Sequence, residues 1–497
     1  MLLVATRPDA TRPDVSAARG DLDGSVMKRR VLLFSVNRCV TPDPVFPLGL
    51  AHLNAALRAS GHETRWHDVQ SPGEALEPLL VEFAPHVVGI SLRNIDDVLI
   101  RKQETYYGDL VTWVARIRAV HACTIVIGGS GFSLFPERLL ELSGADFGIQ
   151  GEGERSFTEL IEALATGGPI GGIAGLVERR EGRIVVNPGG TSEAMGPLEE
   201  IDRPAALVAH YLGAGGMLNV QTQRGCAHTC CYCTYPLIEG RRNRRREPED
   251  VAEEFARIEA QGASYVFIVD SIFNSSPQHV AGMCEAIRRR RLRLRWGCFL
   301  RPQGLDVELM RLMREAGLAH AEFGSDSFCD SVLESYGKQL TFADILQSHQ
   351  AARSAGVEAC HFLICGGPGE TAQTLEEGHR HSLQLDEAVI MAMVGMRIYP
   401  GTALHRRALR EGRVTETTDL LPPVYYLAPG LTEEVVFQRL DEFRARSPNW
   451  IAGHPAPEYA KLVQRLRSRG VTGPLWSYFA VLQRLRPAMS QPAIVAT

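Results

Sequence analysis

The sequence of 497 residues has no apolar run long enough to cross a bilayer and only four lysines. Its longest candidate, residues 388–396, is far shorter than the 18 or more residues that a membrane-spanning helix requires. The N-terminus has no extended apolar segment, so no signal peptide is predicted. The net charge of −5 argues against a nucleic-acid partner. These absences predict a cytoplasmic protein with no integral membrane segment and no nucleic acid bound.

The composition is that of a folded protein with more than one domain. Hydrophobic residues make up 45% of the chain and charged residues 22%, as in typical globular proteins. The length is sufficient for two or three domains. Residues 1–27 contain few large apolar side chains and are predicted to be a disordered extension.

Residues 28–167 are predicted to form the first domain. Five short apolar segments alternate there with longer segments whose apolar residues recur at helical spacing. The five segments begin at Val31, Glu63, His86, Thr124 and Asp146. This alternation predicts a parallel sheet covered by helices on both faces. Such sheets bind ligands at the carboxyl ends of their strands, where the glycines of residues 128–131 and 151–153 fall.

The alternation restarts after residues 168–216, which are predicted to be a linker with a β-hairpin. Six strand segments alternate with helices between residues 217 and 415, a pattern that predicts a partial (β/α)6 barrel. Residues 416–497 are predicted to be mainly helical. The predicted fold class is therefore α/β: a doubly wound, Rossmann-like domain, then a partial TIM barrel, then a helical C-terminal region.

Cysteine is concentrated at one place. Four of the eleven cysteines lie within eight residues, directly after the first strand of the second domain. Three of them, Cys226, Cys230 and Cys233, have the spacing Cys-x3-Cys-x2-Cys, and three thiolates on one loop can bind a [4Fe–4S] cluster and leave its fourth iron open. Structural zinc is the alternative, but zinc needs four ligands. Cys231 or His228 would have to complete that set, and neighbouring residues do not easily converge on one tetrahedron.

This loop resembles that of the radical S-adenosylmethionine (SAM) superfamily in its three cysteines, in Tyr232 before the last of them, and in its position after the first barrel strand. The resemblance implies that the three cysteines bind a [4Fe–4S] cluster and that SAM chelates the open iron. An electron from the cluster then cleaves SAM to a 5′-deoxyadenosyl radical, so the resemblance also implies an external electron donor of the flavodoxin or ferredoxin type. Cys231 lies outside the triplet and is expected to be packed.

Segments at the ends of the later strands are assigned to the SAM side of the site by the same resemblance. With Tyr232, the predicted SAM-binding residues are Asp270, Phe273, Gly324, Asp326, Ser327, Gly366, Gly367, Pro368 and Pro400. Many relatives have Glu at the position of Asp326. Each segment alone would also fit an ordinary turn or helix cap, but their order at successive strand ends favours a shared site.

The first domain resembles the cobalamin-binding domain of the B12-dependent branch of this superfamily, through its doubly wound pattern, its Pro47-Leu-Gly-Leu segment and its two glycine segments. The predicted cobalamin-binding residues are Asn37, Gly128, Gly129, Ser130, Gly131, Gly151, Glu152 and Gly153. The Asp-x-His-x-x-Gly motif that supplies a cobalt ligand is absent, so base-off cobalamin without a histidine on cobalt is expected. A Rossmann-like domain that binds another nucleotide, or nothing, is the alternative.

In this branch a methyl group passes from SAM through methylcobalamin to a carbon radical of the substrate. The resemblance therefore implies a C-methyltransferase that acts on an unactivated carbon of a small molecule or of a lipid or natural-product precursor. A B12-dependent rearrangement, cyclisation or sulfur insertion without methyl transfer is the alternative. A non-catalytic protein that binds SAM or a corrin is disfavoured by the intact cysteine triplet.

Three other features have ordinary structural explanations. The arginine-rich segments 241–246 and 288–295 fit helix ends and solvated faces, with Arg244, Arg245 and Arg246 as candidate contacts to anionic groups. The strand cysteines 298, 360 and 365 are expected to be buried and not to bind an auxiliary cluster. The aromatic residues of segment 416–497 are expected either to close the barrel beside a substrate or to pack on its exterior.

Overall fold

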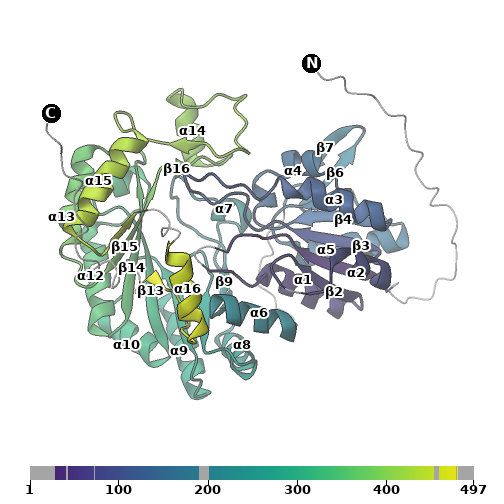
Figure 1. Ribbon diagram of the computed structural model, residues 1–497, viewed down its shortest axis with the longest axis horizontal. Coiled ribbons are helices and arrows are strands. Elements are labelled where there is room, and N and C mark those ends of the chain that lie inside the picture. The colour runs from purple at the N-terminus through teal and green to yellow at the C-terminus, as the bar shows by residue number, and fades with distance from the viewer. Residues whose placement is uncertain are drawn as a thin grey trace.

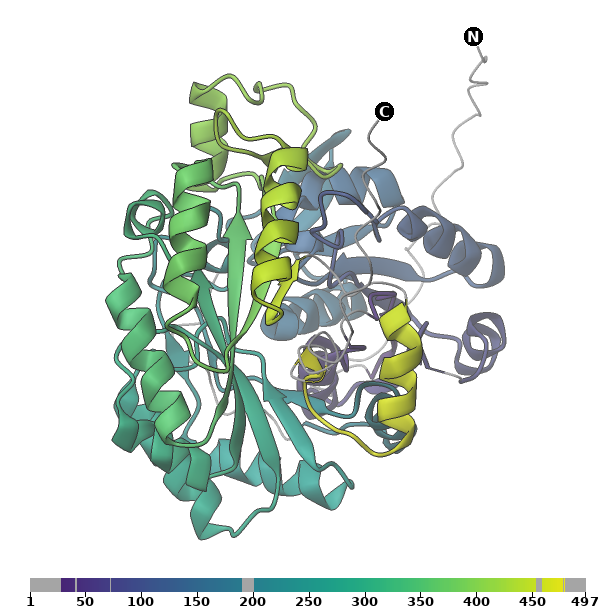
Figure 2. The same cartoon turned by 60° about the vertical axis from the view of Figure 1, so that its left-hand side comes forward.

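The computed structural model describes residues 28–40, 43–71, 73–189, 201–452, 458–476 and 478. They form two α/β lobes that lie side by side, the N-terminal lobe in purple and blue and the C-terminal lobe in green and yellow (Figures 1 and 2). The predicted extension, residues 1–27, lies outside the described residues.

The N-terminal lobe is built on a seven-stranded sheet in the order β2-β1-β3-β4-β5-β6-β7. The pairs from β2 to β5 are parallel, and β6 and β7 are added as antiparallel strands. The strands are β1 (Arg30–Ser35), β2 (Glu63–Asp68), β3 (Val87–Ser91), β4 (Thr124–Gly128), β5 (Phe147–Ile149), β6 (Leu176–Arg180) and β7 (Arg183–Val186). The hairpin that the sequence places in a linker is therefore an extension of this sheet.

Helices cover both faces of this sheet because its parallel strands are apolar on both sides. The helices are α1 (Leu48–Ala59), α2 (Leu76–Phe83), α3 (Asp109–Val120), α4 (Pro136–Ser143) and α5 (Gly153–Thr166). Val31 and Leu33 of β1 belong to the core under α1 and α5, whereas Leu32 and Phe34 belong to the core on the side of α2 and α3. The doubly wound architecture is thus as predicted, with α4 as an additional helix.

The C-terminal lobe contains a second, entirely parallel seven-stranded sheet in the order β18-β15-β14-β13-β12-β11-β8. Its strands are β8 (Leu218–Val220), β11 (Tyr265–Ile268), β12 (Arg295–Leu300), β13 (Leu318–Asp326), β14 (Glu358–Cys365), β15 (Val389–Val394) and β18 (Trp450–Ala452). Six of them are the predicted barrel strands. The seventh, β18, comes from the C-terminal region and pairs with β15, so that region is not only helical.

Two short ribbons accompany this sheet. One pairs β9 (Gln223–Arg224) with β10 (Arg244–Arg245), and the other pairs β16 (Met396–Arg397) with β17 (Tyr425–Tyr426). The sequence predicts one strand over residues 389–398, but the chain turns at Gly395, where φ is +78°, and leaves the parallel sheet.

Helices pack on the outer face of the curved sheet and leave its inner face turned toward the N-terminal lobe (Figure 1). The helices of this lobe are α6 (Ala205–Gly215), α7 (Tyr235–Ile238), α8 (Pro248–Ala260), α9 (Pro277–Arg289), α10 (Val307–Glu315), α11 (Asp330–Ser335), α12 (Phe342–Ser354), α13 (Ala372–Ser382), α14 (Ala403–Arg410), α15 (Glu433–Arg446) and α16 (Glu458–Ser468).

Candidate functional site

The cysteine loop begins at a glycine. Gly225 follows β9 with a φ of +87°, and an added Cβ would collide with the carbonyl oxygen of Arg242. Within the loop, the Cys233 N–H donates to the carbonyl oxygen of Cys230 at 3.2 Å. The loop is therefore a tight, defined turn at the carboxyl end of the first barrel strand.

Three thiols of this loop are the predicted ligands of the cluster. Cys226 is buried, and Cys230 and Cys233 are half-buried. Burial raises the pKa of Cys230, and it raises that of Cys233 to about 12, so iron would have to displace their protons. The Cys231 sulfur lies elsewhere, 4.0 Å from Sδ of Met396. Within the described ranges, no three His, Cys, Asp or Glu side chains are grouped as a single metal ion requires, whereas three thiols on one loop fit a [4Fe–4S] cluster.

The residue before the last cysteine is anchored at the end of β13. The Tyr232 hydroxyl donates to a carboxylate oxygen of Asp326. Nζ of Lys338 lies 2.5 Å from Oδ2 of Asp326 and donates to the carbonyl oxygen of Gly324 at 2.7 Å. Three predicted SAM-side residues are thus brought together, and Lys338 is the buried cation that the sequence analysis missed.

Two predicted SAM-binding side chains are fully buried. Asp270 accepts hydrogen bonds from the N–H groups of Thr222 at 2.7 Å and Gln223 at 3.2 Å, and burial raises its pKa to about 7. Phe273 packs edge-on against Trp296, with 5.6 Å between the ring centroids. Both side chains are 0% exposed, and their predicted role in binding SAM stays a prediction. Asp270 orders the backbone that leads into the cysteine loop.

The glycine turn after β14 is held by two buried side chains. The carboxyl of Glu370 accepts a hydrogen bond from the Gly366 N–H, and burial raises its pKa to about 8. The Tyr336 hydroxyl accepts a hydrogen bond from the Gly367 N–H at 3.1 Å, and a Cβ at Gly367 would collide with that ring. The SAM-binding roles of Ser327, Gly366, Gly367, Pro368 and Pro400 stay predictions.

A cavity of about 720 Å³ lies between the two lobes, at the carboxyl ends of β1, β3, β4 and β5. All the predicted cobalamin-binding residues line it: Asn37, Gly128, Gly129, Ser130, Gly131, Gly151, Glu152 and Gly153. At Gly129 the φ is +101°, and a Cβ would lie 2.6 Å from the carbonyl oxygen of Leu92. The glycines of this edge place no side chains in the cavity, which leaves room for a bulky ligand such as cobalamin.

The C-terminal lobe supplies the opposite wall of the same cavity. Tyr235 and Ile238 of α7 line it together with Phe362, Met391 and Met393 of the inner sheet face. The cavity therefore joins the glycine edge of the first sheet to the mouth of the barrel.

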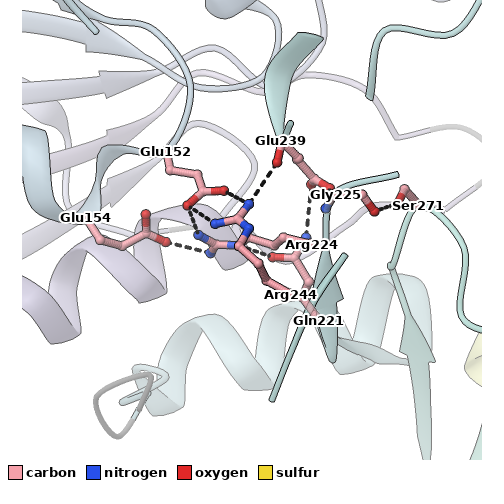
Figure 3. Close-up of polar contacts among 8 residues, drawn as sticks. All are labelled: Glu152, Glu154, Gln221, Arg224, Gly225, Glu239, Arg244 and Ser271. Carbon is pink, nitrogen blue, oxygen red and sulfur yellow. Dashed lines mark hydrogen bonds and ion pairs between the residues drawn. The ribbon is translucent and has the colours of Figure 1, made fainter. Parts of the chain in front are cut away.

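Four charged side chains tie the lobes together beside this cavity (Figure 3). Nη1 of Arg244 donates to Oε2 of Glu152 at 2.8 Å, and Nη2 of Arg224 donates to Oε1 of Glu154 at 2.6 Å. Burial alone would raise the pKa of Glu154, but the charge and hydrogen bond of Arg224 outweigh it and lower the pKa to about 2. Glu152, predicted to bind cobalamin, thus has its carboxylate occupied by arginine at the lobe interface.

The same network reaches the cysteine loop. Gln221 accepts a hydrogen bond from Nε of Arg224 at 2.8 Å and donates to Oε1 of Glu239 at 3.1 Å. Oε2 of Glu239 accepts a hydrogen bond from the Gly225 N–H at 3.1 Å (Figure 3). A continuous chain of polar contacts therefore runs from the N-terminal lobe to the first residue of the cysteine turn.

The three candidate arginines of the first arginine-rich segment bind groups of the protein itself. Arg246 pairs with the buried Glu254, which also pairs with Arg203. Arg245 donates to the hydroxyl of Ser275 at 2.9 Å. Arg244 forms an ion pair with Glu152, so each of the three candidate arginines has an internal partner.

The three strand cysteines lie in separate hydrophobic cores. Cys298 belongs to the core under α8, α9 and α10, Cys365 to the core near α12 and α13, and Cys360 to a small cluster with Trp476. They are packed residues, as expected from the sequence.

The inner face of the barrel sheet carries a row of aromatic side chains. Phe299 of β12 is 38% exposed, because it faces the interior of the barrel. Its ring centroid lies 5.0 Å from that of Phe267 and 6.4 Å from that of Phe362. Met391 and Met393 continue this apolar wall into the shared cavity.

Residues near the end of the described chain pack against the inner face of the barrel sheet. The indole N–H of Trp476 donates to Oε1 of Glu322 at 2.9 Å, and its ring lies 5.4 Å from that of His320. Gly473 packs directly on the ring of Tyr265. Trp476 therefore packs against the inner face of the barrel sheet and not on its exterior, and a role of this segment beside a substrate stays a prediction.

The buried Glu322 carboxyl should make the stability of the fold depend on pH. Burial raises its pKa from 4.5 to about 7 despite the bond from Trp476, so it stabilises the fold below pH 4.5 and this contribution is lost as the pH rises through 7. Glu322→Gln cannot ionise, and its free energy of unfolding relative to wild type should rise by about 3 kcal/mol between pH 4.5 and 8. Anaerobic denaturant titrations at both pH values measure this. Equal pH dependence of the two proteins would contradict it.

None of the helices in the described part of the chain is long and apolar enough to cross a membrane.

Family comparisons agree with this geometry. Residues 35–161 match the B12 binding domain and residues 220–380 match the radical SAM superfamily. Tryptophan 2-C-methyltransferase of Streptomyces laurentii is 26% identical over 447 residues, covering 75% of this chain and 74% of that protein. Hopanoid C-3 methylase of Methylococcus capsulatus is 27% identical over 386 residues, covering 73% of this chain and 70% of that protein.

A solved structure extends the similarity to the whole architecture. The radical SAM methyltransferase TsrM of Kitasatospora setae, determined with cobalamin and a [4Fe–4S] cluster bound, superposes with a TM-score of 0.81 at 25% identity. The match covers 92% of this chain and 98% of that one. A second structure of that protein contains tryptophan and a SAM analogue. With a B12 binding domain, a radical SAM domain and one cavity between them, the chain has the two-domain architecture of the cobalamin-dependent radical SAM enzymes.

Proposed function

We propose that this protein is a C-methyltransferase that transfers a methyl group from SAM to an unactivated carbon of a small organic substrate. The observation that carries the proposal is the single cavity lined both by the glycine edge of the N-terminal sheet and by Phe362, Met391 and Met393 of the barrel. A methyl carrier resting on that edge would face a substrate held in the barrel. The relatives described above, which methylate tryptophan or hopanoids by name, support the same reaction class.

When bound, the cofactors would generate the radical and carry the methyl group. The protein would position the cofactors and the substrate and exclude water. Cys226, Cys230 and Cys233 would hold the cluster at the top of the barrel. The hydrogen bond from Tyr232 to Asp326 holds the cysteine loop against the end of β13. The aromatic wall and Trp476 give the barrel interior apolar side chains, which would help to exclude water from a carbon radical.

The substrate class follows from the same wall. Its exposed members are aromatic or thioether side chains, which favour a largely apolar small molecule or a lipid or natural-product precursor. The three candidate contacts to anionic groups, Arg244, Arg245 and Arg246, pair with internal groups instead. We further propose that the enzyme works in the cytoplasm, where an external flavodoxin- or ferredoxin-type donor can reduce the cluster.

The reaction type is tested with methyl-labelled SAM and candidate apolar substrates, using anaerobically reconstituted protein. We expect label in the product, with S-adenosylhomocysteine and 5′-deoxyadenosine formed together. The Cys226→Ala variant is the matched control and should form neither. Formation of 5′-deoxyadenosine without methyl transfer would contradict the proposal and favour a rearrangement, cyclisation or sulfur insertion.

A further inference from the structure

Two buried polar side chains in the wall of the shared cavity have atoms without a partner. His52 lies on the face of α1 that lines the cavity, is 3% exposed, and neither of its ring nitrogens has a hydrogen-bond partner among the described residues. Asn219 of β8 lines the same cavity from the other lobe. Its Oδ1 likewise finds no partner within the described chain.

The orientation of Asn219 is fixed. Its Nδ2 donates to the carbonyl oxygen of Phe46 at 2.9 Å, so the atom left over is the acceptor, Oδ1. A third cavity residue with an unpartnered atom, Asp97, is different because Nζ of Lys102 lies 3.8 Å from that atom. Buried polar groups in folded proteins nearly always have partners, and an unmade hydrogen bond destabilises the fold. Two such unmade hydrogen bonds in the wall of one cavity indicate that a ligand supplies the missing partners.

The chemical class of that ligand follows from the unpartnered atoms of His52 and Asn219. Burial, with a contribution from the charge of Arg224, lowers the pKa of His52 to about 3. The ring is therefore neutral and presents one N–H donor and one nitrogen acceptor. Asn219 adds a carbonyl acceptor. A carboxylate or phosphate would meet one donor and two acceptors, whereas a neutral amide or hydroxyl matches all three.

We propose that His52 and Asn219 are cobalamin-binding residues that hydrogen-bond neutral amide or hydroxyl groups of the cofactor. Cobalamin carries primary amides around its ring and hydroxyls on its nucleotide, so it offers both donors and acceptors. The two residues come from different lobes, and the bound cofactor would bridge them with neutral contacts beside the charged network of Glu152, Glu154 and Arg224. This inference rests on the cofactor of the proposed function but not on the reaction that it performs.

The proposal predicts opposite effects of one substitution on the two forms of the protein. His52→Phe keeps a planar ring but removes both unpartnered nitrogens. In protein with its cluster but without cobalamin, the melting temperature should stay the same or rise, because an unsatisfied buried group is gone. The Kd for hydroxocobalamin, from an anaerobic absorbance titration, should rise about tenfold or more. A residue with a purely structural role would instead lower the melting temperature and leave the Kd unchanged.

Three further variants complete the test. His52→Gln offers a donor and an acceptor again and should bring the Kd back to within about threefold of wild type. Asn219→Leu, which also removes the bond to Phe46, should raise the Kd about tenfold and lower the melting temperature. His62→Phe is the matched control: His62 is 4% exposed with an unpartnered Nε2, but it does not line the cavity, and its Kd for cobalamin should be that of wild type.

Two results would overturn the inference. One is an unchanged cobalamin Kd in both His52→Phe and Asn219→Leu. The other is an unchanged cobalamin Kd with a raised KM for SAM or substrate, which would assign the neutral group to another ligand. Failure of the wild-type protein to retain cobalamin would be a different result, because it would contradict the cofactor itself.

Discussion

Replacing Cys226, Cys230 and Cys233 together by Ala is expected to remove the iron–sulfur cluster completely. The three thiols are the proposed cluster ligands, and a cluster with one open iron would have no further protein ligand to hold it. Anaerobically reconstituted triple variant should therefore contain no cluster iron, lack the charge-transfer absorbance and form no 5′-deoxyadenosine from SAM. Iron analysis, the visible spectrum and product chromatography measure the three effects.

The neighbouring cysteine supplies the control. The Cys231 sulfur lies beside Met396, and its N–H donates to the carbonyl oxygen of Tyr336 at 2.8 Å, a bond that substitution of the side chain leaves intact. Cys231→Ala should keep full iron content and SAM cleavage. Full iron and cleavage in the triple variant, or loss of the cluster in Cys231→Ala, would show that the ligand set has been assigned wrongly.

Glu152→Ala should cost about 3–5 kcal/mol of stability, because it leaves Arg224 and Arg244 buried without one of their carboxylate partners. Both arginine side chains are less than 10% exposed. Since the glutamate and the arginines belong to different lobes, the variant should also unfold in two resolved steps where wild type unfolds in one. Denaturant unfolding, followed separately by cobalamin absorbance and by cluster absorbance, would resolve the steps.

An exposed ion pair of similar geometry shows what burial contributes. Nη1 of Arg58 lies 2.8 Å from Oδ2 of Asp202, with both side chains more than half exposed. Arg58→Ala should cost at most about 1 kcal/mol, because solvent screens such pairs. A loss below 1 kcal/mol in Glu152→Ala as well would remove the lobe-joining role assigned to the network.

Most of the fold could be predicted because its main elements have local sequence patterns. Buried parallel strands appear as short apolar runs, and amphipathic helices appear through their periodicity, so the order of the main elements follows from the sequence. The positions of the short elements could not be predicted in this way. The strand β18 has three residues, too few for a pattern, and its place is set by pairing with β15. The hairpin was visible, but its attachment to β5 depends on an edge elsewhere in the chain.

The sequence by itself determined which chemistry-bearing residues the protein has: the cysteine triplet with Tyr232, and the glycine segments at strand ends. Only the tertiary structure decided what surrounds them. It assigned Glu152 to Arg244, 92 residues away, and Glu322 to Trp476, 154 residues away. It also buried Asp270 and Phe273 and left His52 and Asn219 facing one cavity with unpaired atoms. The physical reason is that ligand spacing on one loop is a local property of the chain, whereas burial, ion pairing and unmet hydrogen bonds arise only when distant segments pack together.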